Sequence, residues 1–166
     1  MKIAALVLTL AVLLLPARGE TITAGNLAVS LDIPASWTIQ ENPQKPQEYT
    51  AISPDRKHLV VLNVSPPLSE DTLPKSEEEV RRIFLEAFKA QGATIAPGTV
   101  TPLAGLDFYE YSITVPQARL LTFVGVAGQQ AIMLQLADAS RSGQKPGDDP
   151  VLKAIAASLK VAPKQP

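Results

Sequence analysis

The sequence has no cysteine, one histidine and few aromatic residues, which make up 5% of its 166 positions. The lack of cysteine excludes disulfides and thiolate metal sites, and a lone histidine leaves a transition metal short of ligands. Glycine-rich phosphate-binding motifs are also missing. Basic and acidic residues nearly balance, 15 against 16, without the basic cluster that nucleic acids or anionic lipids require. We therefore predict no catalytic residues, no metal, no cofactor and no nucleic-acid partner.

The first 19 residues have the pattern of a secretory signal peptide. Lys2 is followed by thirteen almost uninterrupted apolar residues, 3–15, then by Pro16 and a small-residue triplet at 17–19. A membrane-spanning helix needs about 20 apolar residues, so this run fits the alternative of an uncleaved anchor less well. No cysteine follows the run, which excludes a lipoprotein anchor. We predict cleavage after Gly19 and a periplasmic or secreted protein without a stable membrane anchor.

The remaining chain, residues 20–166, has the length of one domain. A chain of 147 residues can bury roughly 68–70% of the surface that it exposes when unfolded, which is enough for a self-sufficient core. The leader carries Lys2 and Arg18 but no acid, so its loss leaves 13 basic residues against 16 acidic ones, a net charge of −3. This mild acidity fits general solubility.

Four segments of the first half have the residue patterns of β-strands. They are 26–33, 37–40, 49–53 and 58–64. Residues 26–33 alternate apolar and polar side chains, which gives the strand one apolar face. Residues 58–64 are apolar on both faces, which predicts a central strand covered on both sides. Two prolines predict a loop at 41–47, and residues 54–57 have the composition of a tight turn.

The second half predicts an edge strand followed by an antiparallel meander. Residues 94–102 are interrupted by proline and glycine, which suits the edge of a sheet. Three further strands are predicted at 106–115, 119–127 and 131–138. Because only three residues separate each strand from the next, these strands can form only antiparallel hairpins.

Two amphipathic helices complete the pattern. The first follows Ser76, whose spacing to Glu79 is that of a capping box, and it stops at Gly92. Its predicted apolar stripe consists of Val80, Ile83, Phe84, Ala87 and Phe88. The second helix begins at Pro150 with Asp149 as its N-cap. The tail from residue 162 onward is expected to fray.

The order of strands, helix, meander and helix predicts an α+β domain in which helices flank an antiparallel sheet. This layout, together with the turn motif Ile33-Pro34-x-x-Trp37, resembles the PsbP-like and DcrB-like group of small α/β/α sandwich proteins. The resemblance spans most of residues 25–161. It implies a binding protein rather than an enzyme, because most relatives of this shape are binders. Photosystem accessory subunits, envelope lipoproteins and toxin chaperones share the shape, but the leader of this chain departs from the targeting of each.

Two groups of residues could carry chemistry, and each has a simpler structural explanation. Ser53, Asp55 and His58 are close enough in sequence to suggest a Ser-His-Asp array. Such arrays are defined by geometry, however, and an aspartate also suits a tight turn for backbone reasons. Asp148 and Asp149 could touch a hard cation such as calcium, but paired acids before a helix are first explained by the helix dipole.

Three functions are open at this point. The first is an exported, non-enzymatic binding or accessory protein of the bacterial cell envelope, which holds a protein or peptide on a sheet face or in a groove between sheet and helix. The second is a carrier of a small apolar ligand, in a cavity lined by Phe84, Phe88, Phe123 and Met133. The third is a small hydrolase that uses His58.

Overall fold

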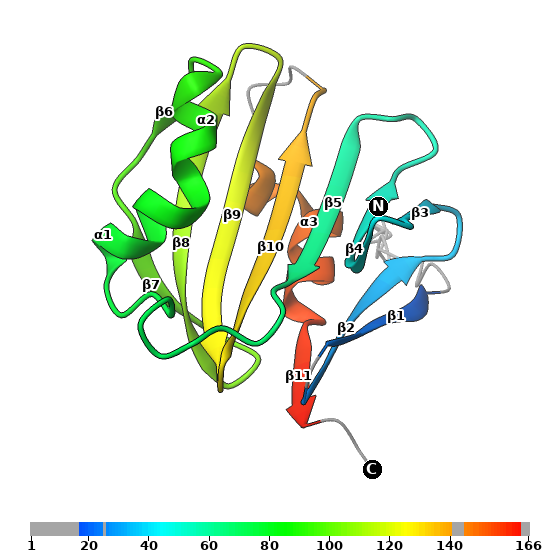
Figure 1. Ribbon diagram of the computed structural model, residues 1–166. Coiled ribbons are helices and arrows are strands. Elements are labelled where there is room, and N and C mark those ends of the chain that lie inside the picture. Colours follow the sequence, from blue (N-terminus) through cyan, green and yellow to red (C-terminus); the bar gives the residue numbers. More distant parts are fainter. Residues whose placement is uncertain (1–16, 25, 141–144, 164–166) are drawn as a thin grey trace, which may run out of the picture.

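The computed structural model describes residues 17–24, 26–140 and 145–163, which form two antiparallel sheets with helices packed against them (Figure 1). The large sheet has eight strands in the order β3-β4-β5-β10-β9-β8-β6, and β7 also pairs with β8. Its strands are β3 Thr38–Asn42, β4 Lys45–Ile52, β5 His58–Val64, β6 Thr94–Ile95, β7 Thr99–Leu103, β8 Leu106–Val115, β9 Ala118–Ala127 and β10 Gln130–Asp138. The small sheet contains β1 Ala17–Ala24, β2 Leu27–Pro34 and β11 Lys160–Pro163, in the order β1-β2-β11.

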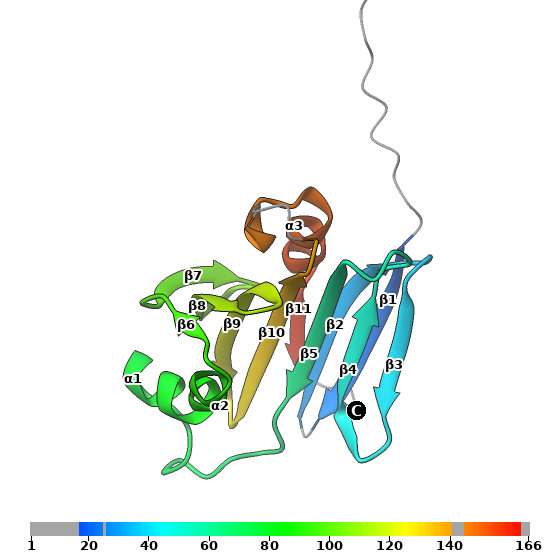
Figure 2. The same cartoon turned by 90° about the horizontal axis from the view of Figure 1, so that it is seen from above.

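The large sheet is covered on both faces, but by different elements. One helical segment lies over β8 and β9 and consists of α1 Glu77–Val80, the π-helical turn η1 Arg81–Leu85 and α2 Glu86–Ala90. The opposite face carries α3 Pro150–Ala157 and the small sheet, which Figure 2 shows from above. Within the described ranges, none of the helices is long and apolar enough to cross a membrane.

Apolar side chains divide into one cluster on each face of the large sheet. The larger cluster, between the two sheets and under α3, includes the fully buried Val29, Leu31, Ile33, Val60, Leu62 and Val64. The smaller cluster lies under the helical segment and includes Val80, Leu85, Tyr111 and Val124. Each fully buried aliphatic side chain contributes about 1.5–3 kcal/mol, so burial alone can hold this chain together without disulfides.

The predicted α+β class, with an antiparallel sheet flanked by helices, is confirmed. The strand over 58–64 is central, between β4 and β10, and the meander of β8, β9 and β10 is antiparallel throughout. The edge strand predicted over 94–102 corresponds to β6 and β7. The second outer layer differs from the expected one, because it contains the small sheet in addition to α3.

Two strands of the small sheet were missed by the sequence interpretation. β1 begins at Ala17, inside the predicted leader, and pairs with β2 from Ala17–Pro34 to Ala24–Leu27. Cleavage after Gly19 stays a prediction; it would remove the first three residues of β1, and residues 1–16 lie outside the described part of the chain. The fraying predicted from residue 162 is wrong for residues 162 and 163, which pair with β2 in strand β11.

The loop predicted at 41–47 is also wrong, because β3 and β4 form a hairpin there. The turn is closed by the backbone N–H of Gln44, which donates to Asn42 Oδ1 at 3.0 Å. A bulge between Glu41 and Asn42 shifts the register of the hairpin. Pro46 lies in this shifted stretch, outside the paired positions of both neighbouring strands, so its missing N–H leaves no gap in the ladder.

The first helix begins as predicted, but its buried face is rotated. Ser76 Oγ accepts the N–H of Glu79 at 3.3 Å, which confirms the N-cap. The π-helical turn then adds a residue to the repeat, so that Leu85 is buried and Ile83 is 45% exposed. The predicted stripe is therefore wrong at Ile83 and also at Ala87, which is exposed.

Candidate functional site

Ser53, Asp55 and His58 lie together at the turn between β4 and β5, where their hydrogen bonds stabilise the turn. The Ser53 hydroxyl donates to Asp55 Oδ1 at 2.7 Å and accepts the backbone N–H of His58 at 3.0 Å. Asp55 Oδ1 also accepts the backbone N–H of Lys57 at 3.1 Å. These two bonds to the carboxylate, the one from Ser53 first, lower the pKa of Asp55 from its ordinary value. The proton of the serine is thus directed to Asp55 and not to an imidazole.

The imidazole of His58 faces Asp149 at the start of α3. His58 Nε2 lies 3.3 Å from Asp149 Oδ2, and the two side chains are 20% and 16% exposed. The ring stacks on Trp37, with centroids 6.3 Å apart and an angle of 12° between the planes. Oδ1 of Asp149 caps α3 by accepting the N–H groups of Val151 and Leu152. His58 therefore joins β5, α3 and the Trp37 turn.

These contacts argue against the hypothesis of a hydrolase that uses His58. A nucleophilic serine needs a base within hydrogen-bond reach, and in the described structure the ring of His58 is engaged by Asp149 while the hydroxyl of Ser53 is engaged by Asp55. The Ser-His-Asp array is not assembled from these three residues. His58 has a structural role, which we name the His58 clamp: the contact of His58 with Asp149 and Trp37.

The aspartate pair considered for calcium does not form a cation site. Both carboxylate oxygens of Asp149 are occupied, one by the helix N-cap and one by His58. Among the described residues, no three His, Asp or Glu side chains are grouped closely enough to hold a metal ion.

The four side chains proposed to line an apolar cavity do not come together. Phe84, Phe88 and Met133 pack against the cluster under the helical segment, whereas Phe123 belongs to the cluster on the opposite face of the large sheet. A single cavity cannot be lined from both faces of a continuous sheet. The carrier hypothesis is therefore wrong in the form that the sequence suggested.

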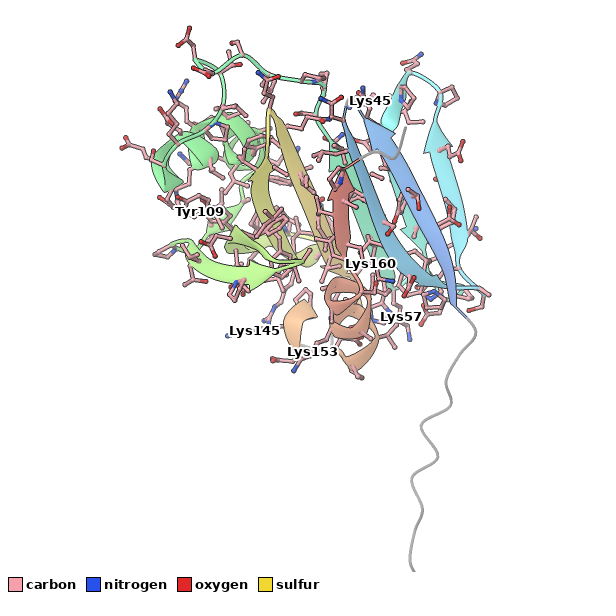
Figure 3. All side chains as sticks on the ribbon, turned by 90° about the horizontal axis from the view of Figure 1, so that it is seen from below. Lys45, Lys57, Tyr109, Lys145, Lys153 and Lys160 are labelled. Carbon is pink, nitrogen blue, oxygen red and sulfur yellow. The ribbon has the colours of Figure 1, made fainter. Side chains whose placement is uncertain are left out.

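An open groove lies between the start of α1 and the strands β7, β8 and β9. Its volume is about 220 Å³, and we name it the helix groove. Its lining residues are Pro74, Lys75, Val80, Val100, Asp107, Phe108, Tyr109, Val124, Gly125 and Val126. Val100, Tyr109 and Val124 are direct partners across three neighbouring strands, so their side chains share the face that the helix covers. In Figure 3, Tyr109 is labelled between the helical segment and these strands.

The helix groove combines an apolar floor with an unpaired strand edge. Val100 is 60% exposed, although large apolar side chains in this chain are otherwise mostly buried. It belongs to β7, whose only strand neighbour in the described structure is β8. Lys75 and Asp107 place one charge of each sign among the lining residues. Such a groove can accept an apolar side chain while the strand edge pairs with an extended backbone.

Comparison with known proteins identifies the fold. The structure is similar to the solution structure of cyanobacterial PsbP (CyanoP) from Synechocystis sp. PCC 6803, with a TM-score of 0.60 and 16% sequence identity. The match covers 85% of this chain and 95% of that one. The fold is PsbP-like. This confirms the PsbP part of the resemblance that the layout and the Trp37 turn had indicated.

A second solved structure is also similar to this chain. It is a crystal structure from Bacteroides thetaiotaomicron VPI-5482, with a TM-score of 0.51 and 9% identity, and the match covers 84% of this chain but only 49% of that one. No protein-family model matches the sequence, and no curated protein matches it either.

Val100, the exposed residue of the helix groove, was not singled out in the sequence, although a signal for it exists. Val100 lies between two threonines in a segment already predicted as a sheet edge, and an apolar residue on an edge strand has no neighbouring strand to cover it. Within the PsbP-like fold, the groove is the place where the helical segment leaves this edge open.

Proposed function

We propose that this chain is an exported, non-enzymatic accessory protein of the bacterial cell envelope, and that it binds a peptide or protein partner in the helix groove. The single observation that carries this proposal is the exposure of Val100, 60% of whose surface is open beside an apolar groove and a strand edge. Exposed apolar surface next to unpaired backbone is a recurrent feature of peptide-binding edges.

The PsbP-like fold supports a binding role over catalysis. The resemblance in the sequence implies binders, and the residues that could have formed a serine nucleophile stabilise a turn and the His58 clamp instead. The partner we propose is an extended segment that presents at least one apolar side chain. Its backbone would lie along β7 and its side chain would contact Tyr109 and Val124.

The test is site-specific photo-crosslinking in intact cells. A photoreactive residue in place of Val100 is expected to yield a discrete adduct with one partner. The same residue in place of Lys153, which is exposed on α3 on the other side of the large sheet, is the matched control (Figure 3). We expect no adduct from position 153, and we expect Tyr109→Ala to reduce the adduct formed from position 100. An identical set of adducts from both positions would refute the groove as the binding surface.

Export is tested separately. Fractionation of the native cell should place the protein outside the cytoplasm, and intact mass measurement should show Glu20 as its first residue. A cytoplasmic protein that still begins at Met1 would remove the envelope part of the proposal and leave the groove to be judged on the crosslinking result.

A further inference from the structure

A second pocket opens between the edges of the two sheets, away from the helix groove. Its volume is about 260 Å³, and its walls come from β1 and from the β3–β4 hairpin. We name it the edge pocket. The residues used in the argument are Glu20 and Ile22 from β1, Ile39 and Glu41 from β3, and Glu48 and Tyr49 from β4.

Tyr49 carries a buried hydroxyl without a partner in this pocket. Its cross-strand partners are Glu41 and Leu62, so the ring points toward the space between the two sheets, where Leu62 is part of the core. The side chain is 5% exposed, and its phenolic oxygen is buried with no hydrogen-bond partner among the residues that the structure describes. Buried polar groups are nearly always satisfied in native proteins, so an orphaned hydroxyl on a residue that lines a pocket points to a ligand that supplies the bond.

Carboxylates on both walls give the edge pocket a negative charge. Glu20 comes from the small sheet and Glu41 from the large one, on the same face as Tyr49. Burial first, and then the negative charge of Glu20, raise the pKa of Tyr49, so its phenol stays protonated. The third acid, Glu48, contacts neighbouring side chains: its Oε2 accepts from Asn63 Nδ2 at 3.1 Å and lies 4.0 Å from Lys45 Nζ.

We propose that the edge pocket binds a small organic cation that carries N–H donors, with a primary ammonium or a guanidinium group. The carboxylates of Glu20 and Glu41 attract the positive charge, and the oxygen of Tyr49 accepts one N–H. Ile22 and Ile39 contact the carbon stem. The described residues offer no group that could hold a bare metal ion, and the volume lies below the range of about 300–1,000 Å³ for drug-sized ligands. The ligand is therefore a small amine or a single basic side chain.

The experiment measures binding of three probes by NMR titration, with the protein purified from the expressing cell and its first residue determined by mass. Agmatine carries both an ammonium and a guanidinium group. Tetramethylammonium carries the same type of charge without any N–H. A blocked Gly-Arg-Gly peptide presents the guanidinium on a peptide chain. We expect agmatine to shift the resonances of the edge pocket, and tetramethylammonium to bind more weakly because it cannot donate to Tyr49.

Four variants separate the parts of the site. Tyr49→Phe removes only the hydroxyl. We expect it to lower the affinity for agmatine about tenfold and to leave the affinity for tetramethylammonium unchanged. Glu41 is exposed, and Glu41→Gln should lower the affinity for both cations by up to about fivefold. Glu20→Gln should lower these affinities as well. Glu70→Gln, on the exposed loop before α1, removes the same charge elsewhere and should change nothing.

The outcomes decide the proposal and also the source of the ligand. Agmatine binding without peptide binding assigns a free amine, and peptide binding assigns a basic side chain of a partner. Failure of all three probes to shift the edge pocket would overturn the proposal, as would equal affinity of the wild type and Tyr49→Phe for agmatine. None of these results bears on the helix groove, whose crosslinking test is separate.

Discussion

The His58 clamp makes a prediction in which two functions of one carboxylate can be separated. Asp149 caps α3 through Oδ1 and contacts His58 through Oδ2. Asp149→Ala removes both functions. Asp149→Asn keeps a side-chain oxygen for the N-cap, where asparagine is as good as aspartate, and replaces the charged acceptor facing His58. His58→Phe removes the contact from the other side and keeps a ring that can stack on Trp37.

The magnitudes follow from the geometry. Loss of an N-cap costs about 1 kcal/mol, within a range of about 0.5–2. A hydrogen bond to a charged group contributes about 1.5–3 kcal/mol when it is short and buried, but the contact here is 3.3 Å long and its side chains keep 20% and 16% of their exposure. We therefore assign about 1 kcal/mol to it. Asp149→Ala should lower the free energy of unfolding by about 2 kcal/mol, and Asp149→Asn and His58→Phe should each lower it by about 1 kcal/mol.

The assay is equilibrium unfolding in urea for the wild type and the three variants, supported by thermal melts. One kcal/mol corresponds to about 2–4 °C in Tm for a chain of this size. The double variant Asp149→Asn/His58→Phe should cost no more than either single change, because both remove the same contact. If Asp149→Asn and His58→Phe are each neutral while Asp149→Ala costs only the cap's contribution of about 1 kcal/mol, the cap alone holds α3 and the clamp has no energetic role.

Three further predictions concern the helix, the turn and the orphaned hydroxyl. Leu85→Ala should lower the free energy of unfolding in urea by about 2–5 kcal/mol, because Leu85 is fully buried. Ile83→Ala should lower it by well under about 1 kcal/mol, because Ile83 is exposed. The reverse order would mean that the π-helical turn is absent in solution. Asp55 has a lowered pKa in the folded protein, so its carboxylate stabilises the fold above its ordinary pKa of 3.8, and this stabilisation is lost as the pH falls through the folded value. The difference in free energy of unfolding between wild type and Asp55→Asn should therefore shrink in acid. A difference that grows below pH ~4 would contradict the assignment. Without ligand, Tyr49→Phe should leave the free energy of unfolding unchanged or raise it by up to about 1–3 kcal/mol, since an unsatisfied hydroxyl is removed; a loss of stability would show that the hydroxyl has a partner in solution.

Most of the sheet could be predicted from the sequence, because its strands follow simple patterns. The alternation over 26–33 predicts a strand with one apolar face. The three strands of the meander are joined by linkers so short that the strands can pair only as antiparallel hairpins. The N-cap of α3 was also predictable, since an aspartate before Pro150 is a strong local signal. These features depend on residues close together in the chain.

The features that could not be predicted depend on distant contacts. β1 and β11 are recognisable only through β2, which pairs with both although they stand at opposite ends of the chain. The π-helical turn changes the buried face of the helix without a proline or glycine to mark it. Likewise, Asp149 is 91 residues from His58 in sequence, so a pattern near His58 suggested Ser53 and Asp55 as its partners.

Incomplete covering of the large sheet explains both proposed sites. The helical segment Glu77–Ala90 has 14 residues and is about 21 Å long, whereas β8, with 10 residues, is about 34 Å long. The helix runs along the strands in Figure 1, so it cannot cover the whole of β8, and the helix groove is the uncovered end. On the opposite face, the small sheet ends at β1, and the edge pocket opens where β1 and β3 diverge. A longer helix would bury Val100, and a further strand beside β1 would cover the mouth of the edge pocket with the carboxylates of Glu20 and Glu41. The two openings therefore follow from the lengths and positions of the outer layers, and a ligand at one of them need not affect the other.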